Sequence, residues 1–167
     1  MARRGEAWIR RQRERYRPDA RPLGEEEDAL LAPHFAGATR GSVRIARVAG
    51  IENPPFYREI GKVLLDFTGM SGITFVDTVV VHAGRMPDPP PAAFLFHELV
   101  HVVQYEVLGV AEFTRRYVAG WAEGGFSYHA IPLERQAFRL QAGFESGRLD
   151  RSVDELVAEE LRSGAGA

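Results

Sequence analysis

The chain has 167 residues, 45% of them hydrophobic and 26% charged, which is typical of a single soluble globular domain. Its net charge of −2 provides no general attraction to nucleic acid, and we expect no nucleic-acid partner. Cysteine is absent, so any zinc ion must be held by His, Asp or Glu. The sequence has neither a long uninterrupted apolar run nor a secretory signal pattern. We therefore expect no membrane span and a cytoplasmic location.

Arginine is concentrated at the start of the chain, where residues 1–22 contain eight of them among aromatic and aliphatic residues. This segment could be a basic arm for anionic surfaces, or a mobile or surface-helical tail that neutralises the acidic run at 25–28. Because the second is the usual fate of a charge run, we expect a mobile arm. A single domain over residues 23–162 and a disordered tail over 163–167 complete the expected organisation.

Two segments predict strands. Residues 42–48 alternate apolar and charged side chains, as in a half-exposed strand. Residues 73–82 are rich in β-branched side chains and predict one longer strand. At the edge of a sheet that strand could pair with an extended peptide, whereas at the centre it would belong to the core, and both positions remain open.

Acidic first turns, proline starts and a capping-box pattern predict several helices. They cover residues 25–35, 56–67, 111–121, 132–144 and 152–161.

A further helix carries the motif that dominates the sequence. It is expected to begin near Pro91 and end at Gly109, and it contains His97, Glu98 and His101 in the pattern H-E-x-x-H. Residues four apart lie on the same helix face, so both imidazoles can reach one tetrahedral zinc ion. The alternative is a buried helix with two hydrogen-bonded core histidines. Burying two imidazoles and a carboxylate without partners would cost several kcal/mol, which favours the metal site.

A catalytic zinc ion usually has three protein ligands, so the sequence must supply a third. A longer histidine motif is excluded because Gln104 and Val107 occupy the positions where it requires Gly and His. Glu134, which opens a predicted helix, is the favoured third ligand, although it could instead be a solvated first-turn glutamate. His129 and His82 are the remaining alternatives.

His97, Glu98 and His101, followed by a helical Glu134 with the small Ala137 three residues later, resemble the gluzincin class of zinc metallopeptidases. The resemblance covers roughly residues 73–145 and is closest to small stand-alone gluzincin-like domains. It implies that His97, His101 and Glu134 bind Zn²⁺ and that Glu98 is the general base. It also implies a zincin-like α+β fold, in which a small, mostly antiparallel sheet packs on the H-E-x-x-H helix and further helices follow.

The chain departs from the thermolysin-type pattern at Phe138. That pattern places an aspartate after the ligand glutamate to hold a histidine, whereas an aromatic residue follows Glu134 here by four positions. Asp77 and Gln104 have chemistry suited to supporting the imidazoles instead.

The function expected is zinc-dependent hydrolysis of peptide bonds in a peptide or protein substrate, by a metal-activated water with Glu98 as the base. Tyr128, His129 and Tyr117 are candidates for stabilising the oxyanion. The alternative is a zinc-stabilised binding or regulatory domain with little or no turnover. Retention of Glu98 favours the enzyme, because a purely structural site needs no base.

Overall fold

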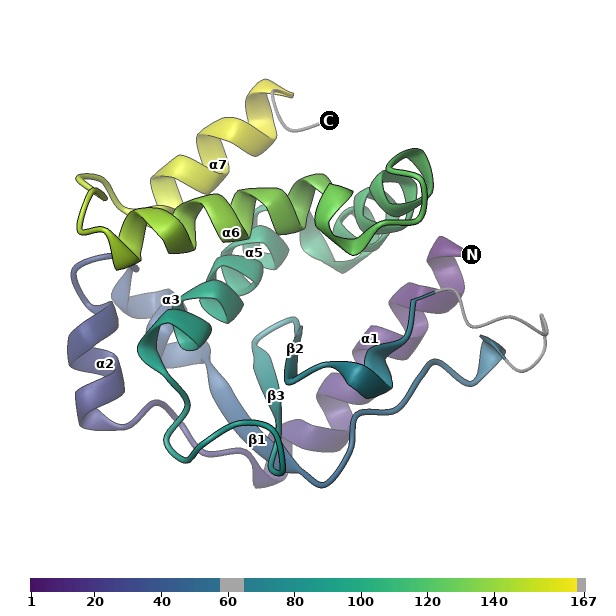
Figure 1. Ribbon diagram of the computed structural model, residues 1–167, viewed down its shortest axis with the longest axis horizontal. Helices are drawn as coiled ribbons and strands as arrows, with labels where there is room; N and C mark the ends of the chain where they lie inside the picture. Colours follow the sequence, from purple (N-terminus) through teal and green to yellow (C-terminus); the bar gives the residue numbers. More distant parts are fainter. Residues whose placement is uncertain (58–64, 165–167) are drawn as a thin grey trace.

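The computed structural model describes residues 1–57 and 65–164, and within them it is an α+β fold, as expected (Figure 1). The helices are α1 (Ala2–Tyr16), α2 (Glu25–Leu31), α3 (Gly37–Ser42), α5 (Ala92–Glu123), α6 (Pro132–Glu145) and α7 (Val153–Ser163). The strands are β1 (Arg44–Val48), β2 (Gly72–Phe75) and β3 (Thr78–His82), and the short 3-10 helices are η1 (Arg17–Asp19), η2 (Phe67–Gly69) and η3 (Tyr128–Ala130).

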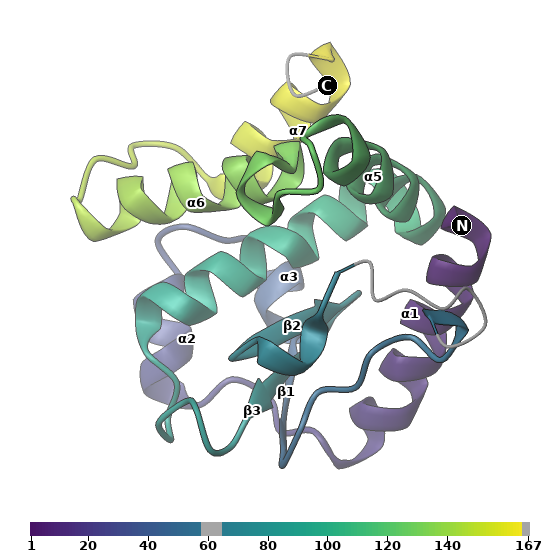
Figure 2. The same cartoon turned by 45° about the vertical axis from the view of Figure 1, so that its right-hand side comes forward.

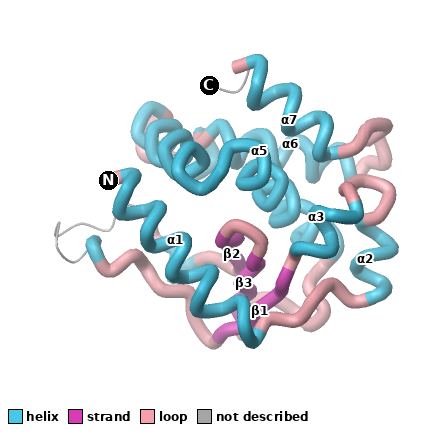
Figure 3. Tube along the Cα trace, turned by 180° about the vertical axis from the view of Figure 1, so that it is seen from behind, coloured by secondary structure: helices cyan, strands magenta, loops and turns pink. Residues whose placement is uncertain are grey.

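The three strands form one mixed sheet in the order β1-β3-β2. The central strand β3 pairs parallel with β1 and antiparallel with β2, so the sheet is mixed and the expected antiparallel pairing holds for the β2–β3 pair alone. The long segment between β1 and β2 allows the chain to return and form a hairpin beside β1. Figure 3 shows the small sheet from behind, surrounded by helices.

The single strand predicted over residues 73–82 is a hairpin that turns at Val76 and Asp77. Val76 has φ 63°, a left-handed conformation that a β-branched residue rarely adopts. Asp77 stabilises the turn by accepting both guanidinium hydrogen bonds of Arg13 at 2.8 Å, with Arg17 at 3.0 Å. The predicted strand could have lain at the edge or at the centre of the sheet. Its first half forms the edge strand β2, and its second half forms the central strand β3.

The arginine-rich start is not a mobile arm, because residues 2–16 form α1 and bury Trp8 and Ile9 against the domain. The Trp8 ring lies 5.3 Å from that of Phe67 and 5.1 Å from that of Phe75. These ring contacts, with Tyr16 against Phe75 and Arg13 against Asp77, attach the helix to the core. Figure 2 shows α1 running beside the hairpin.

Helix α5 is the longest element and joins the others together. It changes direction at Gly109, whose φ of 71° and ψ of 162° are non-helical. The sequence predicted two separate helices that meet at this residue, and the break lies there. Gly120 allows α6 to begin close to α5, since a Cβ there would meet Pro132 Cδ at 2.4 Å. This contact places the first turn of α6 against the axis of α5.

The remaining expected helices largely match α2, α6 and α7. Ser152 precedes α7 as predicted, but its side chain contacts Asp154 and does not cap the helix. Within the expected helix over 56–67, residues 58–64 lie outside the described residues, as do the last three residues of the expected tail. None of the helices in the described part of the chain is both long and apolar enough to span a membrane.

Candidate metal centre

Two helices bring three ligand groups together in the interior. The first half of α5 places His97 and His101 one turn apart, and the first turn of α6 brings Glu134 to them. His97 Nε2 lies 3.2 Å from His101 Nε2, and each lies 3.4 Å from Glu134 Oε2. All three residues are buried, with Glu134 only 3% exposed. Among the residues that the structure describes, this is the group of His, Asp and Glu side chains that could hold a metal ion.

The spacing of these atoms fits a zinc ion. Nitrogen and oxygen ligands at zinc bond lengths of about 2.0–2.2 Å in a tetrahedron lie roughly 3.3–3.5 Å apart. The three observed separations of 3.2, 3.4 and 3.4 Å agree with those edges to within about 0.1 Å. One cation could therefore contact all three groups without rearrangement of either helix.

Hydrogen bonds to the outer imidazole nitrogens orient both rings. The Gln104 amide nitrogen donates to the carbonyl oxygen of Leu133 at 2.9 Å, which leaves its Oε1 facing His101 Nδ1 at 2.8 Å. His97 Nδ1 lies 3.1 Å from Oε1 of Gln141. Because both outer nitrogens face acceptors they carry the ring hydrogens, and the two Nε2 lone pairs face each other. Gln104 is thus a supporting residue as predicted.

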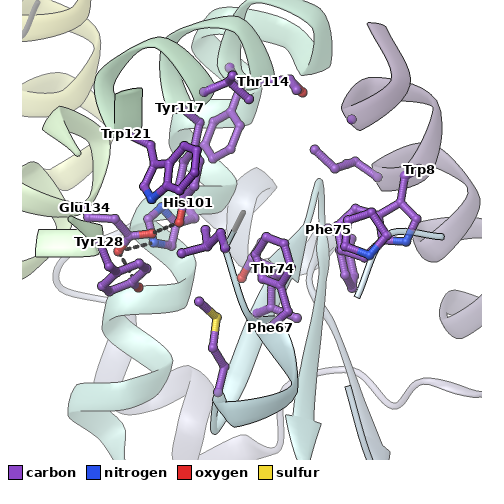
Figure 4. A pocket seen from close by; sticks show the side chains of 18 of the residues that line it. Trp8, Phe67, Thr74, Phe75, His101, Thr114, Tyr117, Trp121, Tyr128 and Glu134 are labelled. Atoms are coloured by element: carbon purple, nitrogen blue, oxygen red, sulfur yellow. Dashed lines mark hydrogen bonds and ion pairs between the residues drawn. The ribbon is translucent and has the colours of Figure 1, made fainter. Parts of the chain in front are cut away.

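Two tyrosines hold the third ligand. Tyr117 and Tyr128 donate their hydroxyl hydrogens to the two oxygens of Glu134, each at 2.7 Å (Figure 4). Burial acts to raise the pKa of Glu134, but when His101 is protonated its charge and hydrogen bond, together with the hydrogen bond from Tyr128, outweigh burial and lower that pKa. Burial and the nearby Glu134 carboxylate raise the pKa of both tyrosines, so both hydroxyls stay protonated.

The cluster attracts positive charge. Burial acts to lower the pKa of His101, but the carboxylates of Glu134 and Glu98 outweigh it and raise that pKa to about 9. Two imidazole lone pairs and a carboxylate oxygen point at the same space, and none of them can donate a hydrogen bond to another when both rings are neutral. A buried arrangement of this kind requires a cation, either a proton or a metal ion.

Glu98 lies beside the cluster but is not part of it. The Thr74 hydroxyl on β2 lies 2.6 Å from Glu98 Oε2, which ties the carboxylate to the edge strand. Its other oxygen, Oε1, accepts no hydrogen bond from the described residues. The carboxylate is thus oriented at one oxygen and available at the other, and Glu98 lines the adjoining cavity.

That cavity has a volume of about 370 Å³ and extends from His101 and Glu134 toward α1. In Figure 4 the polar cluster lies at one end, with Trp8 and Phe75 at the opposite end. A metal ion held by the cluster would therefore be accessible to a molecule in the cavity.

Several other candidates lie away from this centre. Exposed His129 packs its ring 5.5 Å from that of Phe138, and the Nδ1 of His82 accepts a hydrogen bond from Gly84. Neither belongs to the group of possible ligands, so the alternatives to Glu134 are not supported. Asp77 pairs with arginines at the hairpin turn and supports neither imidazole.

Phe138 packs against His97, at the position where the thermolysin-type pattern has an aspartate. Its ring lies 4.6 Å from that of His97. The hydrogen-bond partner of that histidine comes one turn further along α6, from Gln141. The sequence carried a signal for this residue, because Gln141 follows Glu134 by seven positions and thus shares its helix face. Thr74 had no such signal, since its contact with Glu98 depends on the tertiary fold.

No family model, curated protein or solved structure matched the chain in the comparisons with known proteins.

Proposed function

We propose that the protein is a zinc-dependent metallopeptidase of gluzincin type. The observation that carries this proposal is the tetrahedral spacing of His97, His101 and Glu134, with the Glu98 carboxylate facing the same cavity. A structural metal site has no use for a carboxylate held beside it and free at one oxygen.

Zinc is the metal that best suits these ligands. Two neutral imidazoles and one carboxylate are the ligand set of known catalytic zinc sites, and three protein ligands leave a fourth position open. The absence of cysteine argues against the closed thiolate sites of structural zinc. When bound, the ion would activate a water molecule and polarise the scissile carbonyl group.

The chain's own residues would then move the proton. Glu98 would take it from the water through Oε1 and deliver it to the leaving amine. The hydrogen bond from Thr74 would hold the other oxygen of Glu98 still during both transfers. Tyr117 and Tyr128 line the cavity, but each already donates its single hydroxyl hydrogen to Glu134, so either would have to release that carboxylate to stabilise the oxyanion, whereas His129 does not line the cavity.

The edge strand β2 would hold the substrate backbone. The backbone N–H of His82 donates to the carbonyl of Ser71, so in the alternating antiparallel ladder the backbone groups of Gly72 and Thr74 point away from β3. Both residues line the cavity. The Thr74 carbonyl accepts a long hydrogen bond of 3.5 Å from the Tyr105 hydroxyl, so an extended peptide that added to β2 as a further strand would replace that contact.

Three proteins test the proposal. The wild type, saturated with zinc and then dialysed, should retain about one equivalent of zinc, whereas Glu134→Ala should retain almost none. Glu98→Gln should retain zinc but lose cleavage of a mixed peptide library by at least about a hundredfold, because the base is gone. Metal analysis by mass spectrometry and peptide sequencing of products are the measurements.

The outcomes separate the two functions considered. Zinc retained by the wild type without cleavage of any library peptide would support a zinc-stabilised binding domain instead. Equal cleavage by the wild type and Glu98→Gln would rule out the proposed mechanism.

A further inference from the structure

The cavity beside the metal centre follows the free edge of β2 and is walled on both sides. Thr74 turns its side chain toward α5 and Glu98, whereas Phe75 turns its ring toward Trp8 of α1. The cavity reaches residues on both sides of the strand, so it encloses the edge along which an extended peptide would lie. Any segment paired with β2 would therefore place its side chains between two walls.

Both walls are apolar. On the α5 side the cavity is lined by Tyr105, Phe113 and Val118, and on the α1 side by Trp8, Ile9 and Phe67. The charged groups that line it are Glu98, His101 and Glu134, which lie in or directly beside the metal centre. Because the walls are mainly apolar, a charged side chain buried against either of them would lose its hydration and gain few hydrogen-bond partners in return.

The cavity is too large for a single side chain. Its volume of about 370 Å³ is more than twice the roughly 150 Å³ of a cavity that binds one benzene molecule. The indole N–H groups of Trp8 and Trp121, both residues lining the cavity, are buried and have no hydrogen-bond partner among the described residues. Both nitrogens are covered by other atoms of the protein, so the two indoles present apolar ring surface to the cavity.

We propose that the preferred substrate is a peptide segment with large apolar side chains at successive positions beside the scissile bond. Successive side chains of an extended chain point to opposite sides, so such a segment would fill both walls at once. A strand with alternating apolar and polar residues would bury polar groups against one wall. Runs of this kind are normally buried on both faces in folded proteins, which makes unfolded chains or short apolar peptides the substrate class.

This inference rests on the proposed function for the position of the scissile bond, but its test does not require cleavage. The only two tryptophans of the chain both line the cavity, so their fluorescence reports its occupancy directly. Zinc-loaded Glu98→Gln is titrated with three peptides of equal length and net charge. One carries a continuous apolar run, and the other two carry alternating apolar and serine residues in opposite phase.

The continuous peptide should bind at least about tenfold more tightly than either alternating peptide, because only it buries apolar surface on both walls. Equal affinity of all three peptides, or no fluorescence change with any of them, would overturn the inference. Cleavage by the wild-type enzyme without any preference for the continuous peptide would also overturn it. Preferential binding without cleavage would leave the inference standing while the proposed function failed.

Variants that fill the cavity provide a second test. Val118→Phe and Ala122→Phe each add a ring to a lining residue outside the metal centre, and Ala122 is exposed, so its replacement leaves the core intact. Each should weaken binding of the continuous peptide at least about fivefold without changing zinc content. The matched control Ala111→Phe lies on the same helix, is exposed and does not line the cavity, so it should bind as the parent does. Unchanged affinity in both filling variants would contradict the proposed location.

Discussion

Two clusters of charged groups in this molecule show how differently polar side chains can be satisfied. At the hairpin turn, Asp77 accepts hydrogen bonds from Arg13 and pairs with Arg17, so every close contact joins a donor to an acceptor. At the meeting of α5 and α6, His97, His101 and Glu134 point three acceptors at one another. The acceptors of the first cluster are satisfied by donors of the chain itself. Those of the second cluster are satisfied only when a cation, either a proton or a metal ion, binds between them.

The largest expected difference between the clusters is the response to metal. Zinc present at about 1,000 times its dissociation constant should stabilise the fold by about 4 kcal/mol, or roughly 8–16 °C in Tm for a chain of this size. Chelation should remove this gain, and added zinc should restore it, as measured by thermal unfolding followed by circular dichroism. The variant Glu134→Ala should show no zinc-dependent shift. A wild-type Tm that is independent of zinc would mean that a proton, and not a metal ion, occupies the cluster.

A smaller effect is expected at the supporting glutamines. Gln141→Ala removes the group that orients His97, so zinc affinity should fall by about 10- to 100-fold without being abolished. Competition with a fluorescent chelator measures the change. The matched control Gln12→Ala, on α1 and far from the centre in sequence, should leave the affinity unaltered. Equal affinities in the two variants would show that Phe138 alone positions the histidine.

The contribution of the hairpin cluster to stability should not depend on zinc. Asp77→Ala removes the acceptor for two arginines, and because these are partly exposed we expect a loss of about 1–2 kcal/mol in the free energy of unfolding. Urea unfolding with and without zinc should give the same loss in both conditions. A loss of unfolding free energy that depends on zinc would show that the turn and the metal centre are coupled. That result would contradict the separation of the two clusters described above.

The smallest effect concerns a third site, where the Thr39 hydroxyl lies 2.9 Å from Glu106 and 2.8 Å from Asp154. Its single hydrogen can serve only one carboxylate. Burial, reinforced by Asp154, raises the pKa of Glu106 above its ordinary value of 4.5, so the folded state holds the proton longer than the unfolded chain. Stability from this group is therefore present below about pH 4.5 and declines as pH rises through the folded pKa.

Replacing Glu106 with Gln should remove this dependence. Relative to wild type, Glu106→Gln should become progressively more stable as pH rises from 4 to 8, as measured by urea unfolding at each pH. The exposed Glu123→Gln serves as the control and should follow the wild-type profile. A Glu106→Gln profile that runs parallel to the wild type would exclude the raised pKa of Glu106.

Much of the metal centre could be predicted because it depends on local geometry. His97 and His101 share a face through helical periodicity alone, and Pro132 marks the start of the helix that carries Glu134. The positions of Thr74 and Tyr117 around these groups depend on how strands and helices pack, which no spacing in the sequence encodes. Gln141 is an intermediate case. Its position on the same helix face as Glu134 could be predicted from the spacing, but its hydrogen bond with His97 could not.

The errors in the fold have a common physical origin. A β-branched residue such as Val76 has a strong intrinsic preference for a strand, yet here it adopts a left-handed turn that Asp77 and its arginines stabilise from a distance. Likewise, arginines outnumber apolar residues in α1, but burial of Trp8 and Ile9 determines where that helix lies. In both places a tertiary contact outweighed a local preference.

The bend at Gly109 has a consequence for how this molecule could change over time. The part of α5 before the bend carries both imidazoles and Gln104, while the part after it supplies Phe113 and Val118 to the apolar wall. The later part also supplies Tyr117 to Glu134 and Gly120 to the start of α6, so it contacts the cavity and the proposed third ligand together. Substitutions between Phe113 and Val118 that avoid Tyr117 are therefore the changes that would alter the apolar wall and leave the contacts of Glu134 in place.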